Sequence, residues 1–136
     1  MAKSFIREAV VEFGDCDEAG IVFYPKYFYW FDCAFQGLLR RCDLSQRGLR
    51  ARFGAVTPIV DAGARFRSPA SYDDVLAVTA SIELWEERRF RLRYEARCGD
   101  RLVAEGHEVR AWAVLKSDGG IEGGAIPAEF RTLLES

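Results

Sequence analysis

Two aspartates one residue apart, Asp15 and Asp17, are the residues whose types and spacing are best suited to chemistry. They lie in the stretch FGDCDEAGIVFYPKYFYWFD, residues 13–32, directly before a run of aromatic residues. Loop aspartates commonly bond their own backbone or cap a helix, which is the simplest interpretation. A helix that begins just after the loop would also direct unpaired N–H groups and its positive dipole end toward them. A carboxylate beside donors able to hold a developing oxyanion is suited to acyl transfer, so both interpretations stay open.

Histidine and cysteine chemistry is limited by the counts of these residues. The chain has one histidine, His107, which excludes metal sites that need two imidazoles and leaves few partners for a catalytic triad. Its four cysteines, Cys16, Cys33, Cys42 and Cys98, show no C-x-x-C spacing, so we expect free thiols, no disulfide and no zinc. A Cys16 thiolate with His107 as its base is a less favoured alternative to the aspartates.

Composition and charge indicate the broad class of protein. A chain of 136 residues with 49% hydrophobic content is ample for one core, so we expect a single domain over residues 1–136. A formal net charge of −2 supplies no global basic field for nucleic acid or anionic lipid. Arg7 and Glu8 argue against a signal peptide, and no window approaches the roughly 18 apolar residues of a membrane span. We therefore expect a cytoplasmic protein that binds neither nucleic acid nor membrane.

The element that must position the aspartates is a long helix beginning at Tyr24. Its length is about four to five turns. Apolar residues recur there at steps of three and four, at Tyr24, Tyr27, Phe28, Phe31, Phe35, Leu38, Leu39 and Cys42. Pro25 suits the first turn, where its missing N–H would be unpaired anyway. Tyr29 and Trp30 lie off this stripe, so the helix is apolar over much of its girth and should be enclosed by other elements.

The rest of the chain alternates with the period of β-strands. The alternation covers residues 4–13, 60–67, 76–84, 89–97 and 101–116. The last run is interrupted by polar residues, and its apolar members are Val103, Val109, Ala111, Ala113 and Leu115. The breaks SPASYDD, WEER and CGD are short, as hairpin connections are. These periods predict an α+β fold in which about five mostly antiparallel strands curl around one buried helix.

Two segments fall outside this pattern. Residues 43–54 contain several arginines and room for one helical turn. The glycine cluster SDGGIEGG at 117–124 follows the last expected strand and lacks the G-x-G-x-x-G order of a dinucleotide site. We interpret the cluster as a flexible turn.

Three segments resemble the 4-hydroxybenzoyl-CoA thioesterase group of the hotdog-fold superfamily. EFGDCDEAGIVFYPKYFYWFD contains that group's D-x-D-x-x-G pattern followed by an aromatic helix start. TPIV at 57–60 and ASYDDVL at 70–76 are similar to further segments of the same enzymes. The likeness extends from about residue 4 to about residue 115 and agrees with the order of elements above. It implies the hotdog fold, in which a curved antiparallel five-stranded sheet wraps around one long central helix.

The resemblance implies hydrolysis of an acyl-CoA thioester. The catalytic carboxylate of these enzymes falls on Asp17, as nucleophile or as general base, and Asp15 is left as a structural loop acid. The carbonyl-polarising backbone N–H maps to Tyr24, whose N–H has no partner within a helix that starts there. A donor of this kind typically lowers the barrier by about 3 to 4 kcal/mol.

Residues further along the chain are candidates for binding the acyl group. Asp32 borders the apolar stripe, either as a solvated or subunit-contact acid or as the acceptor for a ring hydroxyl, as in the enzymes that the chain resembles. Thr57 and Pro58 resemble walls of the active site. An aromatic acyl group is therefore the leading prediction, and a short or branched aliphatic group is the alternative. An enoyl-thioester hydratase ranks lower because no histidine lies near Asp17, and a non-catalytic acyl-CoA-binding module remains open.

Coenzyme A and assembly complete the expectations. Arg88 and Arg89 lie at a predicted hairpin corner. They either belong to an ordinary solvent-exposed face or bind the phosphates of CoA. CoA is part of the substrate, and we expect no metal or redox cofactor. Tyr29, Trp30 and Trp85, if exposed on a monomer, would be covered by association, and hotdog domains pair through their sheets. We expect a homotetramer built as a dimer of dimers.

Overall fold

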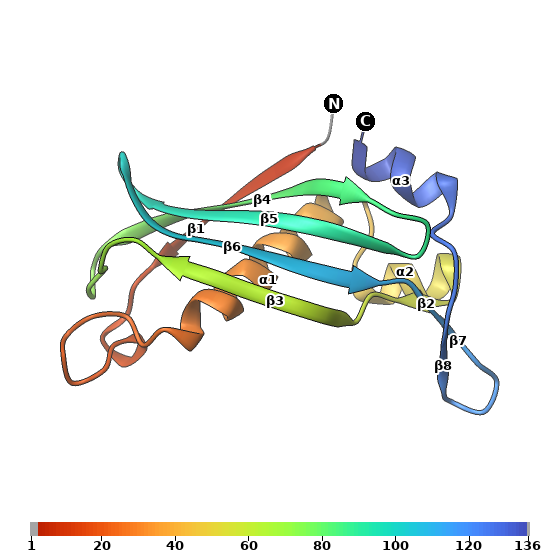
Figure 1. Cartoon of the computed structure of the whole chain (residues 1–136), viewed down its shortest axis with the longest axis horizontal. Helices are drawn as coiled ribbons and strands as arrows, with labels where there is room; N and C mark the ends of the chain where they lie inside the picture. The colour runs from red at the N-terminus through yellow and green to blue at the C-terminus, as the bar shows by residue number, and fades with distance from the viewer. Residues whose placement is uncertain (1–2, 136) are drawn as a thin grey trace.

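The computed structural model describes residues 3–135 and consists of a curved sheet laid over one long helix (Figure 1). The main sheet has five strands in the order β1-β4-β5-β6-β3, each antiparallel to its neighbours. Its strands are β1 (Ser4–Val10), β3 (Ile59–Phe66), β4 (Val75–Trp85), β5 (Arg89–Cys98) and β6 (Arg101–Ala111). A small second sheet joins β2 (Ala55–Val56), β7 (Ala113–Leu115) and β8 (Ile121–Gly123). The helices are α1 (Pro25–Arg41), α2 (Gln46–Phe53) and α3 (Ala128–Glu135).

Helix α1 confirms the long enclosed helix expected from the sequence. Pro25 is its first residue and Tyr24 its N-cap. Two glycines allow the sheet to approach closely: a Cβ on Gly37 would overlap the Phe5 ring of β1, and one on Gly106 of β6 would overlap the Phe31 ring. The helix is therefore held against both sides of the curved sheet by contacts that only glycine permits.

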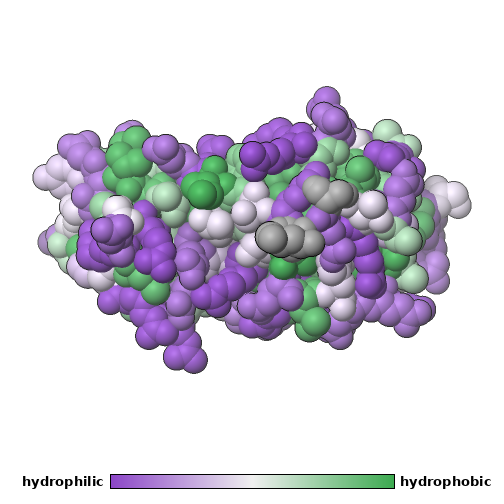
Figure 2. Space-filling model, turned by 90° about the horizontal axis from the view of Figure 1, so that it is seen from above, coloured by the Kyte–Doolittle hydropathy of each residue, from purple (hydrophilic) through white to green (hydrophobic). Residues whose placement is uncertain are grey.

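The buried arc of α1 is wider than the predicted stripe. Trp30, expected to point outward, is 6% exposed and packs edge-on against Tyr27, with ring centroids 5.5 Å apart. Trp85, which the sequence groups with Tyr29 and Trp30 as an outward aromatic residue, is half-buried and packs against Phe90 and Phe130. Phe130 belongs to α3, a helix that the sequence patterns did not predict. Seen from above, the exposed hydrophobic residues form separate patches among hydrophilic ones (Figure 2).

The inward face of β6 differs from the expected one. Opposite Ala96 and Arg97 of β5, β6 carries one extra residue, and Val103 and Ala104 are both buried there. An extra residue in one strand is a β-bulge, and it exchanges the two faces of the strand that follows. The even-numbered residues after the bulge therefore face the core: Ala104, Gly106, Glu108, Arg110 and Trp112. Glu108 and Arg110 are buried, whereas Val109 and Ala111 are only half-buried.

Three local expectations are corrected. Residues 43–54 contain the two-turn helix α2, Gln46–Phe53, capped by the Ser45 hydroxyl, which accepts from the Gly48 N–H at 3.1 Å. The glycine cluster contains a turn, but it also supplies β8, which pairs with β7. The first strand ends at Val10, and Phe13 lies in a short 3-10 helix with 79% of its surface exposed. No helix within residues 3–135 is long and apolar enough to cross a membrane.

Candidate functional site

Asp17 lies in a tight turn that leaves its carboxylate exposed. Its Oδ1 accepts from the Ala19 N–H at 2.9 Å, its own N–H donates to Ile21 O, and its carbonyl accepts from Gly20, whose φ is +82°. These contacts are the turn bonding expected of a loop aspartate. No described residue donates a hydrogen bond to Oδ2. The turn therefore holds the carboxylate in place through Oδ1 and leaves Oδ2 free.

Asp15 ties the loop to the helix. Its Oδ2 accepts from the Glu12 N–H at 2.9 Å, and its Oδ1 lies 3.2 Å from Nζ of Lys26 in the first turn of α1. Its carbonyl accepts from the Phe23 N–H. Both carboxylate oxygens are thus engaged, which supports a structural role for Asp15.

The backbone N–H of Tyr24 lies at the amino end of α1. Among residues 3–135 it has no hydrogen-bond acceptor, and the next residue is a proline. Beside it is an open cavity of about 450 Å³, whose apolar wall is formed by Ile21, Val22, Tyr24, Tyr27, Phe66 and Pro69. Burial raises the pKa of Tyr27 to about 12, so its hydroxyl stays protonated at neutral pH. An unpaired N–H at a helix amino terminus, next to an apolar cavity, is suited to polarising a bound carbonyl.

Asp32 and Thr57 are joined by a residue that the sequence patterns did not single out, and Pro58 follows Thr57 in the chain. Arg110 donates from Nη2 to Asp32 Oδ1 at 2.8 Å and from Nη1 to the Thr57 carbonyl at 3.0 Å. The Pro58 carbonyl accepts from the N–H of Ala111, the next residue of β6. Arg110 is the common partner of two predicted substrate-binding residues.

Arg110 is itself held by a buried carboxylate. Its Nε donates to Glu108 Oε1 at 2.9 Å, the Tyr94 hydroxyl donates to the same oxygen at 2.6 Å, and the guanidinium lies 4.4 Å from the centre of the Phe35 ring. Burial and the Glu108 charge raise the pKa of Tyr94 well above its usual range. Burial alone would lower the pKa of Arg110. The charge of Glu108, the neighbouring Tyr94 and the hydrogen bonds to Glu108 and Asp32 together outweigh burial, so the pKa is raised and Arg110 stays charged.

Arg88 and Arg89 lie apart from the other predicted site residues. They are exposed at the turn between β4 and β5, which Figure 1 shows at the opposite end of the molecule from the loop before α1. Asp32 lies between the two ends, because it is eight positions after Tyr24 along the helix, about 12 Å of rise. The predicted site residues therefore form three groups along the molecule, and one chain does not bring them into a single pocket.

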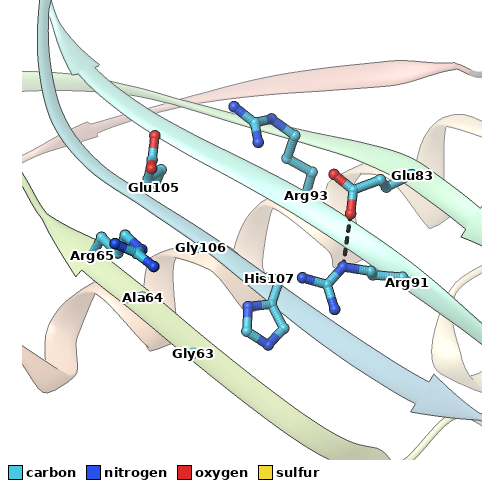
Figure 3. Close-up of a pocket in the computed structure, with 9 residues that line it drawn as sticks. All are labelled: Gly63, Ala64, Arg65, Glu83, Arg91, Arg93, Glu105, Gly106 and His107. Atoms are coloured by element: carbon cyan, nitrogen blue, oxygen red, sulfur yellow. Dashed lines mark hydrogen bonds and ion pairs between the residues drawn. The ribbon is translucent and has the colours of Figure 1, made fainter.

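Cys16 and His107 are not brought together. The Cys16 thiol lies 3.8 Å from the Glu12 carbonyl, whereas His107 Nε2 lies 2.9 Å from Asp61 Oδ2 on the outer face of the sheet. Figure 3 shows His107 in a shallow cavity of that face, among charged side chains. The alternative of a Cys16–His107 pair has no support in this geometry. In the described part of the chain, no group of three or more His, Cys, Asp or Glu residues is arranged to hold a metal ion.

The fold and the loop define the class of protein. Residues 11–132 match the thioesterase-like superfamily, and the chain belongs to this family. Its sheet wrapped around one long helix is the hotdog fold, as the motif resemblance implied.

Individual relatives share a narrower chemistry. The chain is 37% identical to 4-hydroxybenzoyl-CoA thioesterase of Pseudomonas sp. (strain CBS-3) over 138 residues, 96% of this chain and 96% of the relative. A crystal structure of a mutant 4-hydroxybenzoyl CoA thioesterase complexed with 4-hydroxybenzoyl CoA is 34% identical, with a TM-score of 0.89, covering 98% of this chain and 100% of that one. A gentisyl-coenzyme A thioesterase structure is 32% identical, with a TM-score of 0.81, covering 93% and 98%.

Proposed function

We propose that the protein hydrolyses an aromatic acyl-CoA thioester, of the hydroxybenzoyl type, to the free acid and CoA. The observation that carries the proposal is the unpaired Tyr24 N–H beside an apolar cavity and the loop of Asp17. In this proposal the N–H polarises the thioester carbonyl, and Asp17 acts as nucleophile or as the base that activates water. The relatives named for 4-hydroxybenzoyl and gentisyl thioesters both act on hydroxylated rings, which supports the aromatic acyl group.

Asp32, Thr57 and Pro58 are proposed to bind the acyl group, and Arg88 and Arg89 the phosphates of CoA. The ring hydroxyl would donate to Asp32, whose side chain is 43% exposed. Guanidinium groups suit phosphate because they offer paired donors with a permanent charge. A short or branched aliphatic acyl group remains the alternative substrate, since an aromatic wall also accepts it.

Association of two subunits would join the separated groups. Strand β3 is an edge of the main sheet, and Ile59, Val60 and Phe66 on it are 47%, 48% and 49% exposed. Pairing of two such edges about a two-fold axis would cover these residues and continue the sheet. Because the pairing is antiparallel, it would set Phe66 of one subunit near Ile59 of the other, and so the acyl cavity near Thr57 and Pro58. We propose this dimer, and a homotetramer built from two of them.

The proposal also covers the extent of the catalytic domain, the need for cofactors and the place of action. We propose one catalytic domain over residues 1–136, of which residues 1, 2 and 136 lie outside the described part. The reaction needs no metal or redox cofactor, because carboxylate and backbone N–H can supply both the attack and the charge stabilisation. The chain is further proposed to act in the cytoplasm without nucleic acid or membrane partners.

The test is thiol release from a panel of CoA thioesters with 4-hydroxybenzoyl, benzoyl, phenylacetyl and short aliphatic acyl groups. Asp17→Asn is expected to lower kcat about a thousandfold or more while CoA-ester binding is kept. Asp15→Asn, a matched change in the same loop, should retain most activity. Unchanged turnover in Asp17→Asn would remove that residue from the mechanism, and no thiol release from any ester would leave an acyl-CoA-binding module.

A further inference from the structure

The buried Glu108–Arg110 pair has no evident purpose in stability alone. The two side chains are 2% and 5% exposed, on the face of β6 that packs on α1. Desolvating two charges is costly, and apolar residues of similar size are often at least as stabilising. A buried ionic pair is better explained by what it holds in position, and here it holds Asp32 of α1 and Thr57 of the link between β2 and β3.

The hydrogen bonds leave Asp32 with one free acceptor. Its Oδ1 accepts from Arg110 Nη2 at 2.8 Å and from Gln36 Nε2 at 3.1 Å. The side-chain oxygen Oε1 of Gln36 in turn accepts from Gln46 Nε2 at 3.0 Å, which orients the side-chain amide of Gln36. No residue within 3–135 donates to Oδ2. The carboxylate is thus fixed through one oxygen and presents the other.

The charges of the cluster select against an anionic acyl group. Arg110 is neutralised by Glu108, and its Nε, Nη1 and Nη2 all donate within the protein. Glu108, Arg110 and Asp32 together carry one net negative charge. A carboxylate at the end of the acyl group would meet this negative charge beside a guanidinium already paired with Glu108 and Asp32, whereas a hydroxyl would find an oriented acceptor.

We propose that Glu108 and Arg110 are positioning residues that fix the Asp32 carboxylate, and that the acyl site thereby selects a neutral hydrogen-bond donor over a carboxylate at the end of the ring. The inference rests on the proposed function and deepens it. It assigns the choice of substrate to a pair of residues that need not touch the substrate.

The experiment compares kcat/KM for 4-hydroxybenzoyl-CoA, benzoyl-CoA and 4-carboxybenzoyl-CoA. The wild type should prefer the first ester and disfavour the third. The double variant Glu108→Gln/Arg110→Met removes both buried charges together, and it should lower the preference for the hydroxyl over benzoyl by about tenfold. Asp32→Asn should lose the same preference, and adding it to the double variant should cost little more, because both changes remove one interaction.

Controls separate positioning from folding. Arg93→Met/Glu95→Gln changes the same residue types, two apart, on the outer face of β5 and should leave the preference unchanged. Gln36→Leu removes the second donor to Asp32 and the acceptor of Gln46 but keeps the ionic pair. It therefore tests the same idea with a milder change and should reduce the preference about two- to threefold.

Three results would overturn the inference. The first is an equal loss on all three esters in the double variant and in Gln36→Leu. The second is efficient turnover of the carboxylated ester by the wild type. The third is a preference for the hydroxylated ester that Asp32→Asn loses but the double variant keeps. A wild type that releases no thiol from any ester would instead overturn the proposed function.

Discussion

The two faces of the main sheet carry the same ionic pair in different surroundings. On the outer face of β5, Arg93 and Glu95 are 2.9 Å apart, with side chains 49% and 30% exposed. On the inner face of β6, Arg110 and Glu108 are also 2.9 Å apart, with side chains 5% and 2% exposed. Sequence spacing and distance are equal, so the difference lies in the dielectric and in the neighbours. Water screens the outer pair, whereas the inner pair must satisfy its charges within the protein.

The other Arg–Glu pairs on the outer face of the sheet are also open to solvent. Around its shallow cavity, Arg91 Nε lies 2.7 Å from Glu83, drawn as a dashed line in Figure 3, and Arg67 lies 2.8 Å from Glu105. The floor is made of the small residues Gly63, Ala64 and Gly106. Each arginine there has water as a replacement partner. On the inner face, by contrast, removal of one partner leaves a charge that water does not reach.

The largest effect should follow from breaking the inner pair on one side. Arg110→Met leaves Glu108 buried without its partner, and the free energy of unfolding should fall by about 3 to 5 kcal/mol. Urea denaturation at neutral pH measures this change. The double variant Glu108→Gln/Arg110→Met is the control and should be clearly more stable than the single one. A loss below about 1 kcal/mol in Arg110→Met would mean that the pair behaves as a surface pair.

A smaller effect is expected when the inner pair is kept and its neutral donor is removed. Tyr94→Phe deletes the hydroxyl that donates to Glu108 and should lower the free energy of unfolding by about 1.5 to 3 kcal/mol. The Phe31 ring, stacked on Tyr94 with centroids 4.8 Å apart, keeps the aromatic packing in both proteins. A neutral result in urea denaturation would show that Glu108 needs no donor besides Arg110.

The outer pair should matter much less. Arg93→Met is expected to change the free energy of unfolding by about 0 to 1 kcal/mol, and added salt should reduce the difference further. The same denaturation series at low and high salt measures both quantities. A loss as large as that of Arg110→Met would contradict the contrast between the two faces.

The smallest effect is a dependence on pH at the outer face. The hydrogen bond from Arg67 lowers the pKa of Glu105. A carboxyl with a lowered folded-state pKa contributes stability above its unfolded pKa, and loses it as the pH falls through the folded value. Titration of the Glu105 carboxyl by NMR should show the low pKa, and Arg67→Met should return it toward the ordinary value. An unchanged pKa in that variant would assign the shift to another neighbour.

Much of the fold and part of the site follow from local patterns. The stripe of α1 and the alternation of β4 and β5 depend on nearest neighbours along the chain, so they were predicted with small errors at their ends. Asp17 and Tyr24 could be proposed together for the same reason, because only the six residues 18–23 separate them. The helix α3 and the strand β8 were missed because both are short. In addition, α3 packs through Phe130 on Phe53 and Trp85, which are distant in sequence, and β8 lies in a glycine-rich segment without alternation.

The sequence by itself determined the long helix and the five strands of the main sheet, because the period of each is visible in neighbouring residues. Only the tertiary structure decided which side of β6 faces the core. That choice depends on the extra residue near Val103, and so on the pairing of β6 with β5. A shift of one residue exchanged the faces, buried Glu108 and Arg110, and joined Asp32 to Thr57. No local pattern contains this information, because it arises from register between strands.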